Sequence, residues 1–201
     1  HDVLREYRVV DALQTSPVPL PETLFASEDH DVMGSDFYGT ERLRGDVIRH
    51  EEPARFADPS HRRRIGEEFV DALVAVHETD YEAVDLGDFG RPAGFTRRQV
   101  DRWGTQLDWA FEVTADEREV PELEAVGAWL DENCPETHEH GLVHGDYKLD
   151  NVMFGPGTPP ELVGVFDWEL AALGDPLTDL GWTLAFWYDE GDPEPAVPAL
   201  M

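Results

Sequence analysis

The sequence predicts an α+β protein with a small strand-bearing piece, residues 1–44, and a larger, mostly helical piece, residues 45–201. Short apolar runs bounded by turn residues occur near the start of the chain and again after residue 140, and these runs are typical of strands. Apolar residues at spacings of three and four fill most of the chain between them, and this pattern is typical of helices. A chain of 201 residues, 41% of them hydrophobic, is long enough to bury a core.

The first piece begins with a predicted helix, because Leu4, Tyr7, Val10 and Leu13 recur at helical spacing. Three prolines at positions 17, 19 and 21 then block helix and favour an extended segment. Two strands follow, joined by a polar loop; we expect them over Thr23–Ser27 and Phe37–Leu43.

The second piece should contain helices, then short strands, then a last helix. Apolar residues predict a helix through 69–77, and Pro121 suits the first turn of another. Between these two, Thr96 and Gln99 have the spacing of a capping box. Strands are expected over 141–144, 151–154 and 162–166, and the last helix should begin at Asp175 and Pro176.

The charge of the chain excludes some partners. Forty-four acidic residues against 15 lysines and arginines give a formal net charge of −29. Such a surface repels the phosphates of nucleic acids and anionic membranes, so we expect neither as a partner. The acidic residues are dispersed along the chain, which favours adaptation to a high-salt cytoplasm, as in a halophile. The alternative is an acidic face that selects a cationic substrate.

Cysteine usage and hydropathy indicate a cytoplasmic protein. Cys134 is the single cysteine, so an internal disulfide and a cysteine-rich zinc site are both excluded. The sequence has no apolar run long enough to span a membrane, and it shows no signal peptide. Because the chain begins at His1 and stops just after a proline-rich stretch, we expect it to be truncated at both ends.

The chemistry is concentrated in the segment His144-Gly145-Asp146, in Asn151 five residues after the aspartate, and in Asp167 after a hairpin. Phosphoryl transfer needs one carboxylate to orient a hydroxyl and accept its proton. It also needs oxygen ligands that hold Mg²⁺ against the triphosphate. An aspartate and an amide on one loop, with a second aspartate across a hairpin, supply these groups. Each residue alone would be an ordinary loop residue, and only the whole set predicts a site.

The segments Leu142–Phe154 and Val165–Trp182 resemble the aminoglycoside phosphotransferase family, in its branch of choline-kinase-like and acyl-CoA dehydrogenase-associated kinases. The resemblance extends over nearly the whole chain and implies a protein-kinase-like bilobal fold. It implies that ATP and Mg²⁺ are the cofactors and that the γ-phosphoryl group is transferred to a hydroxyl of a small molecule. Residues 1–44 would be a partial nucleotide-binding lobe with the hinge, and residues 45–201 an incomplete helical catalytic lobe.

The resemblance also implies roles for single residues. Asp146 would be the catalytic base, and Asn151 and Asp167 the magnesium ligands. His144 would brace the catalytic loop, Asp179 would hold its backbone, and Asp175 would cap a helix. Glu6 would pair with the nucleotide-binding lysine, and Glu41, Arg42 and Leu43 would form the hinge that meets adenine.

Lys148 is the only lysine of the chain and follows the base by two residues. A compact cation at this position would stabilise charge that develops on the phosphoryl oxygens, although a tolerated loop lysine is the alternative. The family's glycine-rich loop and nucleotide lysine should precede Glu6, and residues 1–5 contain neither. We therefore expect the 201-residue chain itself to be inactive.

Other functions are less favoured. Gly145 stands where a regulated protein kinase has arginine, and Asp175 follows Asp167 too closely for a long activation segment, so a peptide substrate is not expected. A non-catalytic kinase-fold binding module is opposed by the presence of Asp146, Asn151 and Asp167 together. A metal-dependent phosphohydrolase would need paired carboxylates, for which Asp167 and Glu169 are a weak indication. The acceptor and the oligomeric state are not predicted.

Overall fold

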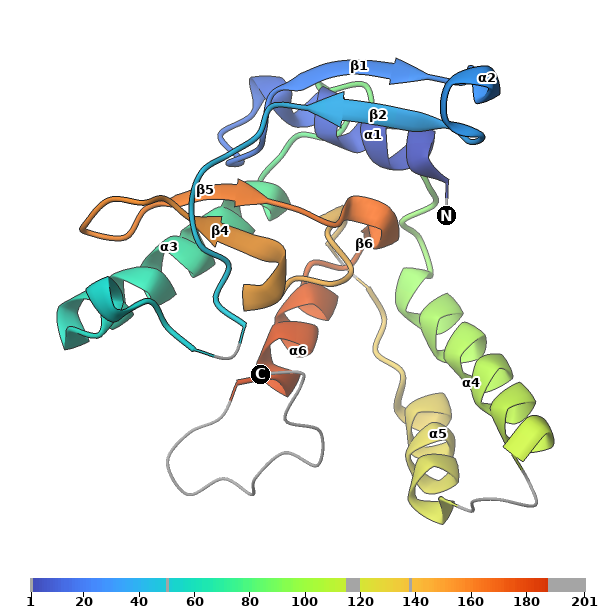
Figure 1. Ribbon diagram of the computed structural model, residues 1–201. Coiled ribbons are helices and arrows are strands. Elements are labelled where there is room, and N and C mark those ends of the chain that lie inside the picture. The colour runs from blue at the N-terminus through green and yellow to red at the C-terminus, as the bar shows by residue number, and fades with distance from the viewer. Residues whose placement is uncertain (1, 50, 115–119, 138, 188–201) are drawn as a thin grey trace.

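The computed structural model describes residues 2–49, 51–114, 120–137 and 139–187. It begins with helix α1 (Val3–Ala12), as the apolar spacing predicts. Asp2 caps this helix, because its Oδ1 accepts a hydrogen bond from the backbone N–H of Arg5 at 3.0 Å. A short 3₁₀ turn (Leu13–Thr15) ends it before the prolines. α1 lies beside a two-stranded hairpin (Figure 1).

That hairpin consists of β1 (Thr23–Ser27) and β2 (Phe37–Thr40), paired antiparallel. The predicted loop between the strands contains a helical turn, α2 (His30–Met33), which Asp29 caps at its start and Gly34 ends with a φ of 81°. β2 stops three residues before the predicted end. The chain there leaves the hairpin, and Asp46 pairs with Phe154 instead.

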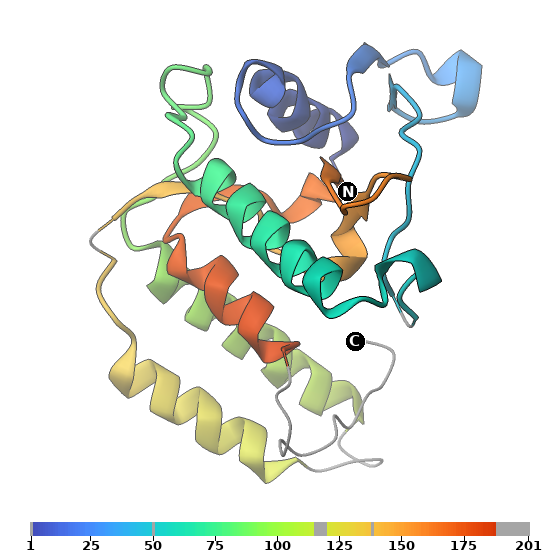
Figure 2. The ribbon, with the colours of Figure 1, turned by 90° about the vertical axis from the view of Figure 1, so that its left-hand side faces the viewer.

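Three long helices follow. The first, α3 (Pro59–His77), begins ten residues before the predicted segment, because Asp58 caps it and Pro59 occupies its first turn. It lies across β3 and β5 (Figure 2). The others, α4 (Phe95–Thr114) and α5 (Pro121–Asn133), contact each other and extend away from the strands (Figure 1). The predicted capping box is wrong: Thr96 lies inside α4, and its Oγ1 is 2.6 Å from the Oγ1 of Thr137.

The remaining strands form two separate antiparallel pairs, of which only the second joins consecutive strands. β3 (Gly141–Val143) pairs with β6 (Ala172–Gly174), and β4 (Val152–Phe154) pairs with β5 (Leu162–Val165). Two 3₁₀ turns, η3 (Leu149–Asn151) and η4 (Trp168–Leu170), connect them at the predicted site residues. α6 (Leu177–Ala185) closes the described chain. Each predicted strand here is one residue too long: His144 and Phe166 lie just beyond the ends of β3 and β5, and Asn151 belongs to the 3₁₀ turn before β4.

One apolar core joins the two pieces of the chain. Val9, Val10 and Leu13 of the first piece belong to the same buried cluster as Phe69 and Trp168 of the second. Two polar contacts reinforce this: Val165 N–H donates to the carbonyl of Pro19 at 2.9 Å, and Arg5 donates to that of Ala171 at 2.8 Å. The turn that carries Asp167 is therefore held from both sides. No helix of the described ranges is long and apolar enough to cross a membrane.

Candidate active site

Asp146 lies on the loop between β3 and η3, and donors from three directions contact its carboxylate. Oδ2 accepts hydrogen bonds from Lys148 Nζ at 3.0 Å and from Asn151 Nδ2 at 2.9 Å. Oδ1 accepts one from the indole Nε1 of Trp182 at 2.8 Å. A loop side chain with this many partners has a defined orientation, which a catalytic base requires.

Asn151 and Asp167 lie on adjacent segments. The backbone N–H of Phe166 donates to the carbonyl of Asn151 at 2.8 Å, where the pairing of β4 with β5 ends. The amide nitrogen of Asn151 faces Asp146, donating to its carboxylate and to its carbonyl oxygen, each at 2.9 Å. This leaves the amide oxygen on the opposite side. An amide oxygen and a carboxylate are the hard oxygen ligands that Mg²⁺ prefers, so this pair fits that ion.

Asp167 has a left-handed backbone, with a φ of 66° and a ψ of 58°. A residue other than glycine rarely adopts this conformation, and it persists where the surroundings determine it. Here those surroundings are β5 on one side and the buried Trp168 of η4 on the other. The strained residue is the one that the resemblance assigns to the metal.

His144 is fully buried and links the two loops. Its Nδ1 accepts the backbone N–H of Asp146 at 3.2 Å, and its Nε2 lies 2.9 Å from the carbonyl of Phe166. Since Nδ1 is an acceptor, the hydrogen must be on Nε2, which donates to Phe166. Burial lowers the pKa of His144 and favours this neutral form. His144 therefore joins the backbone of Asp146 to that of Phe166, the residue before Asp167.

Asp179 of α6 holds the backbone of the same loop. Its carboxylate is 1% exposed and accepts the N–H groups of His144 and Gly145 at 2.8 and 2.7 Å. His77 of α3 lies 2.9 Å from the same carboxylate. Asp175 precedes the N-cap residue Pro176, and its Oδ1 accepts the N–H of Leu177 at 3.0 Å at the start of α6.

The position before Asp146 has room only for a glycine, Gly145. Its φ is 86°, and a Cβ atom built on it would lie 2.6 Å from the carbonyl oxygen of Leu170. Any side chain would collide with the chain that follows Asp167.

We therefore expect Gly145→Ala to lower the free energy of unfolding by about 2–4 kcal/mol, from the left-handed backbone and the overpacking together. Urea denaturation measures this. Gly104→Ala in α4 is the matched control: no atom lies within 4 Å of its Cβ position, and the change should leave stability equal or up to about 1 kcal/mol higher. Equal effects of the two substitutions would contradict the steric argument.

Glu6 of α1 faces the turn that carries Asp167. Its carboxylate accepts hydrogen bonds from the hydroxyl of Tyr38 and the backbone N–H of Trp168. Burial raises the pKa of Glu6, and the nearby carboxylates of Asp167 and Glu169 raise it further. The pKa of Tyr38 is also raised, first by burial and then by Glu6. The structure thus brings Glu6 close to the turn that carries Asp167.

The expected hinge residues lie between β2 and the second piece. Glu41 continues the edge of the hairpin, because its backbone N–H donates to the carbonyl of Glu22 at 2.8 Å. Glu41 and Arg42 are exposed, whereas Leu43 is half-buried against β5. A Cβ atom at Gly164 would lie 2.6 Å from Leu43 Cδ1, so the glycine permits this close approach. Leu43 therefore covers the strand that leads to Asp167.

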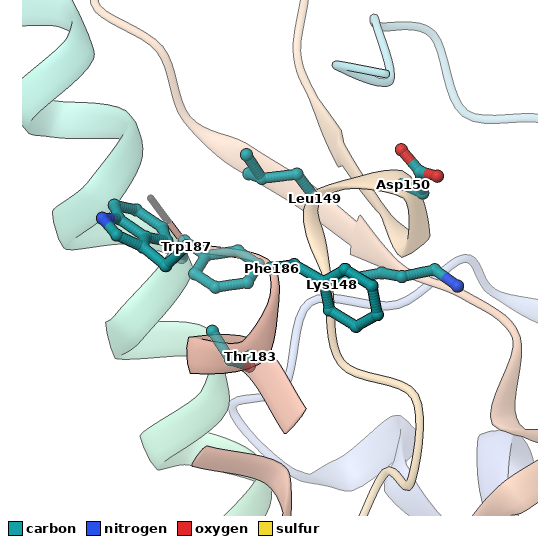
Figure 3. A pocket seen from close by; sticks show the side chains of 7 residues that line it. Lys148, Leu149, Asp150, Thr183, Phe186 and Trp187 are labelled. Carbon is teal, nitrogen blue, oxygen red and sulfur yellow. The ribbon is translucent and has the colours of Figure 1, made fainter. Parts of the chain in front are cut away.

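A shallow pocket lies beside the catalytic loop, between α3 and α6. Its lining includes Lys148, Leu149, Asp150, Thr183, Phe186 and Trp187 (Figure 3). The amine of Lys148 points away from Leu149 and Trp187 (Figure 3). Its Nζ donates to Oδ2 of Asp146 at 3.0 Å. The aliphatic part of Lys148 thus forms part of the apolar pocket wall, while its ammonium group contacts Asp146.

Sequence reasoning missed four side chains of this site: His77, Trp182 and Thr183, which contact Asp179 or the catalytic loop, and Tyr38, which contacts Glu6. Trp182 and Thr183 follow Asp179 by three and four residues, so they share its face of α6. That spacing was a usable signal once Asp179 had been assigned. His77 and Tyr38 are brought in by tertiary packing, for which no local pattern exists.

Comparisons with known proteins show the family and the fold. Acyl-CoA dehydrogenase family member 11 of Gallus gallus is 33% identical over 189 residues, which cover 94% of this chain and 23% of that protein. The chain thus spans under a quarter of the length of that relative. A crystal structure from Ralstonia eutropha, of a protein assigned to the aminoglycoside phosphotransferases, superposes with a TM-score of 0.80 and 33% identity over 98% of this chain and 60% of that one.

More distant structures share the fold. The ternary complex of an aminoglycoside phosphotransferase with streptomycin and ATP has a TM-score of 0.58 at 18% identity, covering 87% of this chain and 57% of that one. The predicted kinase-like α+β fold is therefore confirmed. The sequence model of the phosphotransferase enzyme family matches residues 1–200 of this chain. The chain belongs to that family, the phosphotransferases that include the aminoglycoside phosphotransferases.

Proposed function

We propose that this chain is the catalytic part of a kinase that transfers the γ-phosphoryl group of MgATP to a hydroxyl of a small molecule. The observation that carries the proposal is the Asp146 carboxylate, which three side chains orient beside Asn151. Family membership supports phosphoryl transfer, and structures with the same fold in complex with ATP or with GDP support a nucleotide as the donor.

Each residue has a proposed task. Asp146 accepts the proton of the acceptor hydroxyl, and Lys148 places a positive charge beside the transferred group. Asn151 and Asp167 are the residues that would hold Mg²⁺, which when bound neutralises the triphosphate. Glu6 is the residue that would pair with a lysine that contacts the nucleotide. His144, Asp175 and Asp179 are structural supports.

The nucleotide would lie between the two pieces of the chain. Residues 1–44 act as the small lobe and hinge, with Glu41, Arg42 and Leu43 meeting adenine, and residues 45–201 act as the catalytic lobe. Leu43 supports this placement, because it lies against β5 directly upstream of Asp167.

The hydrolase alternative gains no support from the side chains. Within residues 2–187, less the few left undescribed, no cluster of three or more His, Cys, Asp or Glu residues could hold a metal ion.

The proposal is tested with the full-length protein, MgATP and a panel of hydroxyl compounds that includes sugars, amino alcohols and hydroxy acids. We expect at least one compound to accelerate ADP release, and phosphorus NMR to show a new phosphate monoester in equal amount. Removal of magnesium with EDTA should stop the reaction. Inorganic phosphate as the only product for every compound would favour a hydrolase, and no ADP release with intact nucleotide binding would favour a binding module.

A further inference from the structure

One face of α6 contacts the catalytic loop at successive points. Asp179 accepts the N–H groups of His144 and Gly145. Thr183, four residues later, donates its hydroxyl to the carbonyl of Tyr147 at 2.9 Å. Trp182 lies between these two contacts in sequence and reaches the side chain of Asp146 rather than the backbone. The helix therefore holds both the loop and the carboxylate that the loop presents.

The two oxygens of Asp146 are not equivalent. Each carboxylate oxygen can accept about two hydrogen bonds. Oδ2 accepts two, from Lys148 and Asn151, and is therefore filled. Oδ1 accepts the Trp182 indole N–H, which leaves one position for a further donor. An incoming hydroxyl can therefore donate to Oδ1 without displacing a protein contact.

The indole N–H of Trp182 does not depend on Asp146 for a hydrogen-bond partner. Trp182 is 39% exposed, so water could satisfy its N–H. Its ring is instead held by Phe186, one helical turn further along, with ring centroids 5.0 Å apart and an edge-to-face angle of 71°. A ring that is fixed by packing and directed at the base is suited to setting the direction of the carboxylate.

We propose that Trp182 is a positioning residue that makes Oδ1 of Asp146 the proton acceptor of the transfer. This inference rests on the proposed kinase function. In the step, the acceptor oxygen forms a bond to the γ-phosphorus while the bond from that phosphorus to the bridging oxygen breaks. The electron pair of the broken bond leaves with ADP, and the hydroxyl proton passes to Oδ1.

Two substitutions distinguish the effect of the Trp182 N–H group from the effect of its aromatic ring. Trp182→Phe keeps an aromatic ring against Phe186 and removes the donor. Trp182→His keeps a donor, because histidine Nε2 occupies the place of the indole nitrogen in the five-membered ring. Because a neighbouring carboxylate raises the pKa of a histidine, the assay is repeated at increasing pH, and a recovery that persists comes from the N–H donor rather than from a positive charge.

The substitutions are made in the full-length protein and assayed with the panel compound that the wild type phosphorylates fastest. We expect Trp182→Phe to lower kcat about tenfold, the loss typical of one hydrogen bond to a charged group, with KM for MgATP within about twofold. Trp182→His should recover most of that kcat. Full kcat in Trp182→Phe, equal losses in both variants, or a change confined to KM would each overturn the proposal.

A second measurement does not depend on activity. In full-length protein labelled with 5-fluorotryptophan, Trp182→Phe identifies the resonance of residue 182. Asp146→Ala should shift that resonance and leave the other tryptophan signals in place, whereas an unmoved resonance would overturn the contact. If the wild type shows no transferase activity but the resonance shifts, the proposed function fails while the contact stands.

Discussion

Asp146→Ala in the full-length protein should lower kcat by about 10²–10⁴-fold, the contribution typical of a positioned general base. The side chain of Asp146 is the proposed proton acceptor, and no other carboxylate hydrogen-bonds to Lys148 or Trp182 within the described residues. The measurement is the rate of ADP release at saturating MgATP. KM for MgATP should change little, because the nucleotide contacts are proposed to lie at Glu6 and the hinge.

The fold should tolerate this change. Asn151 keeps its hydrogen bond to the carbonyl of residue 146, and Trp182 and Lys148 are exposed enough for water to replace the lost acceptor. We therefore expect the free energy of unfolding to fall by no more than about 1–2 kcal/mol.

The control is Asp58→Ala, which removes the cap of α3 at a distance from the site. It should lower the free energy of unfolding by about 0.5–2 kcal/mol, a similar amount. Its kcat should equal that of the wild type. If Asp146→Ala keeps the kcat of the wild type, Asp146 is not the base. If Asp146→Ala and Asp58→Ala lose kcat equally, the loss comes from lower stability and not from the missing base.

Asp179→Ala should have the largest effect on stability, about 3–5 kcal/mol. The substitution leaves three donors without their acceptor: the N–H groups of His144 and Gly145, and the ring of His77. Each buried unsatisfied group costs about 1–3 kcal/mol. The two loop N–H groups account for most of the loss, because His77 is partly exposed and water can replace part of its contact. Equilibrium urea denaturation followed by tryptophan fluorescence gives the free energy.

Activity should fall as well, because the loop that carries Asp146 loses its attachment to α6. Asp179→Asn should be intermediate, since the amide keeps one acceptor oxygen but turns an NH₂ group toward the remaining donors. Thr178→Ala is the matched control on the same helix. Its hydroxyl donates only to the carbonyl of Asp175, so the loss should be about 1 kcal/mol or less. If Asp179→Ala is no more destabilising than Thr178→Ala, the carboxylate does not brace the loop.

The sequence predicted most of the elements and the order of the site because local patterns specify them. Apolar spacing located α1 and α3, and turn residues located the short strands. The largest errors lie at ends: β2 stops at Thr40 because the chain turns to pair Asp46 with Phe154, and α3 begins at Pro59 because Asp58 caps it. Both ends are decided by contacts or caps that a periodicity argument does not include.

The sequence by itself determined the residue types of the site, because phosphoryl transfer requires a base, oxygen ligands and a cation, and His144–Asn151 with Asp167 contain them in a specific order. Only the tertiary structure decided how those residues are held. The left-handed Asp167, the collision that reserves position 145 for glycine, and the His144 link to Phe166 arise where separate segments meet. The Trp182 contact that distinguishes the two oxygens of Asp146 arises in the same way, because its direction depends on how α6 packs against the loop.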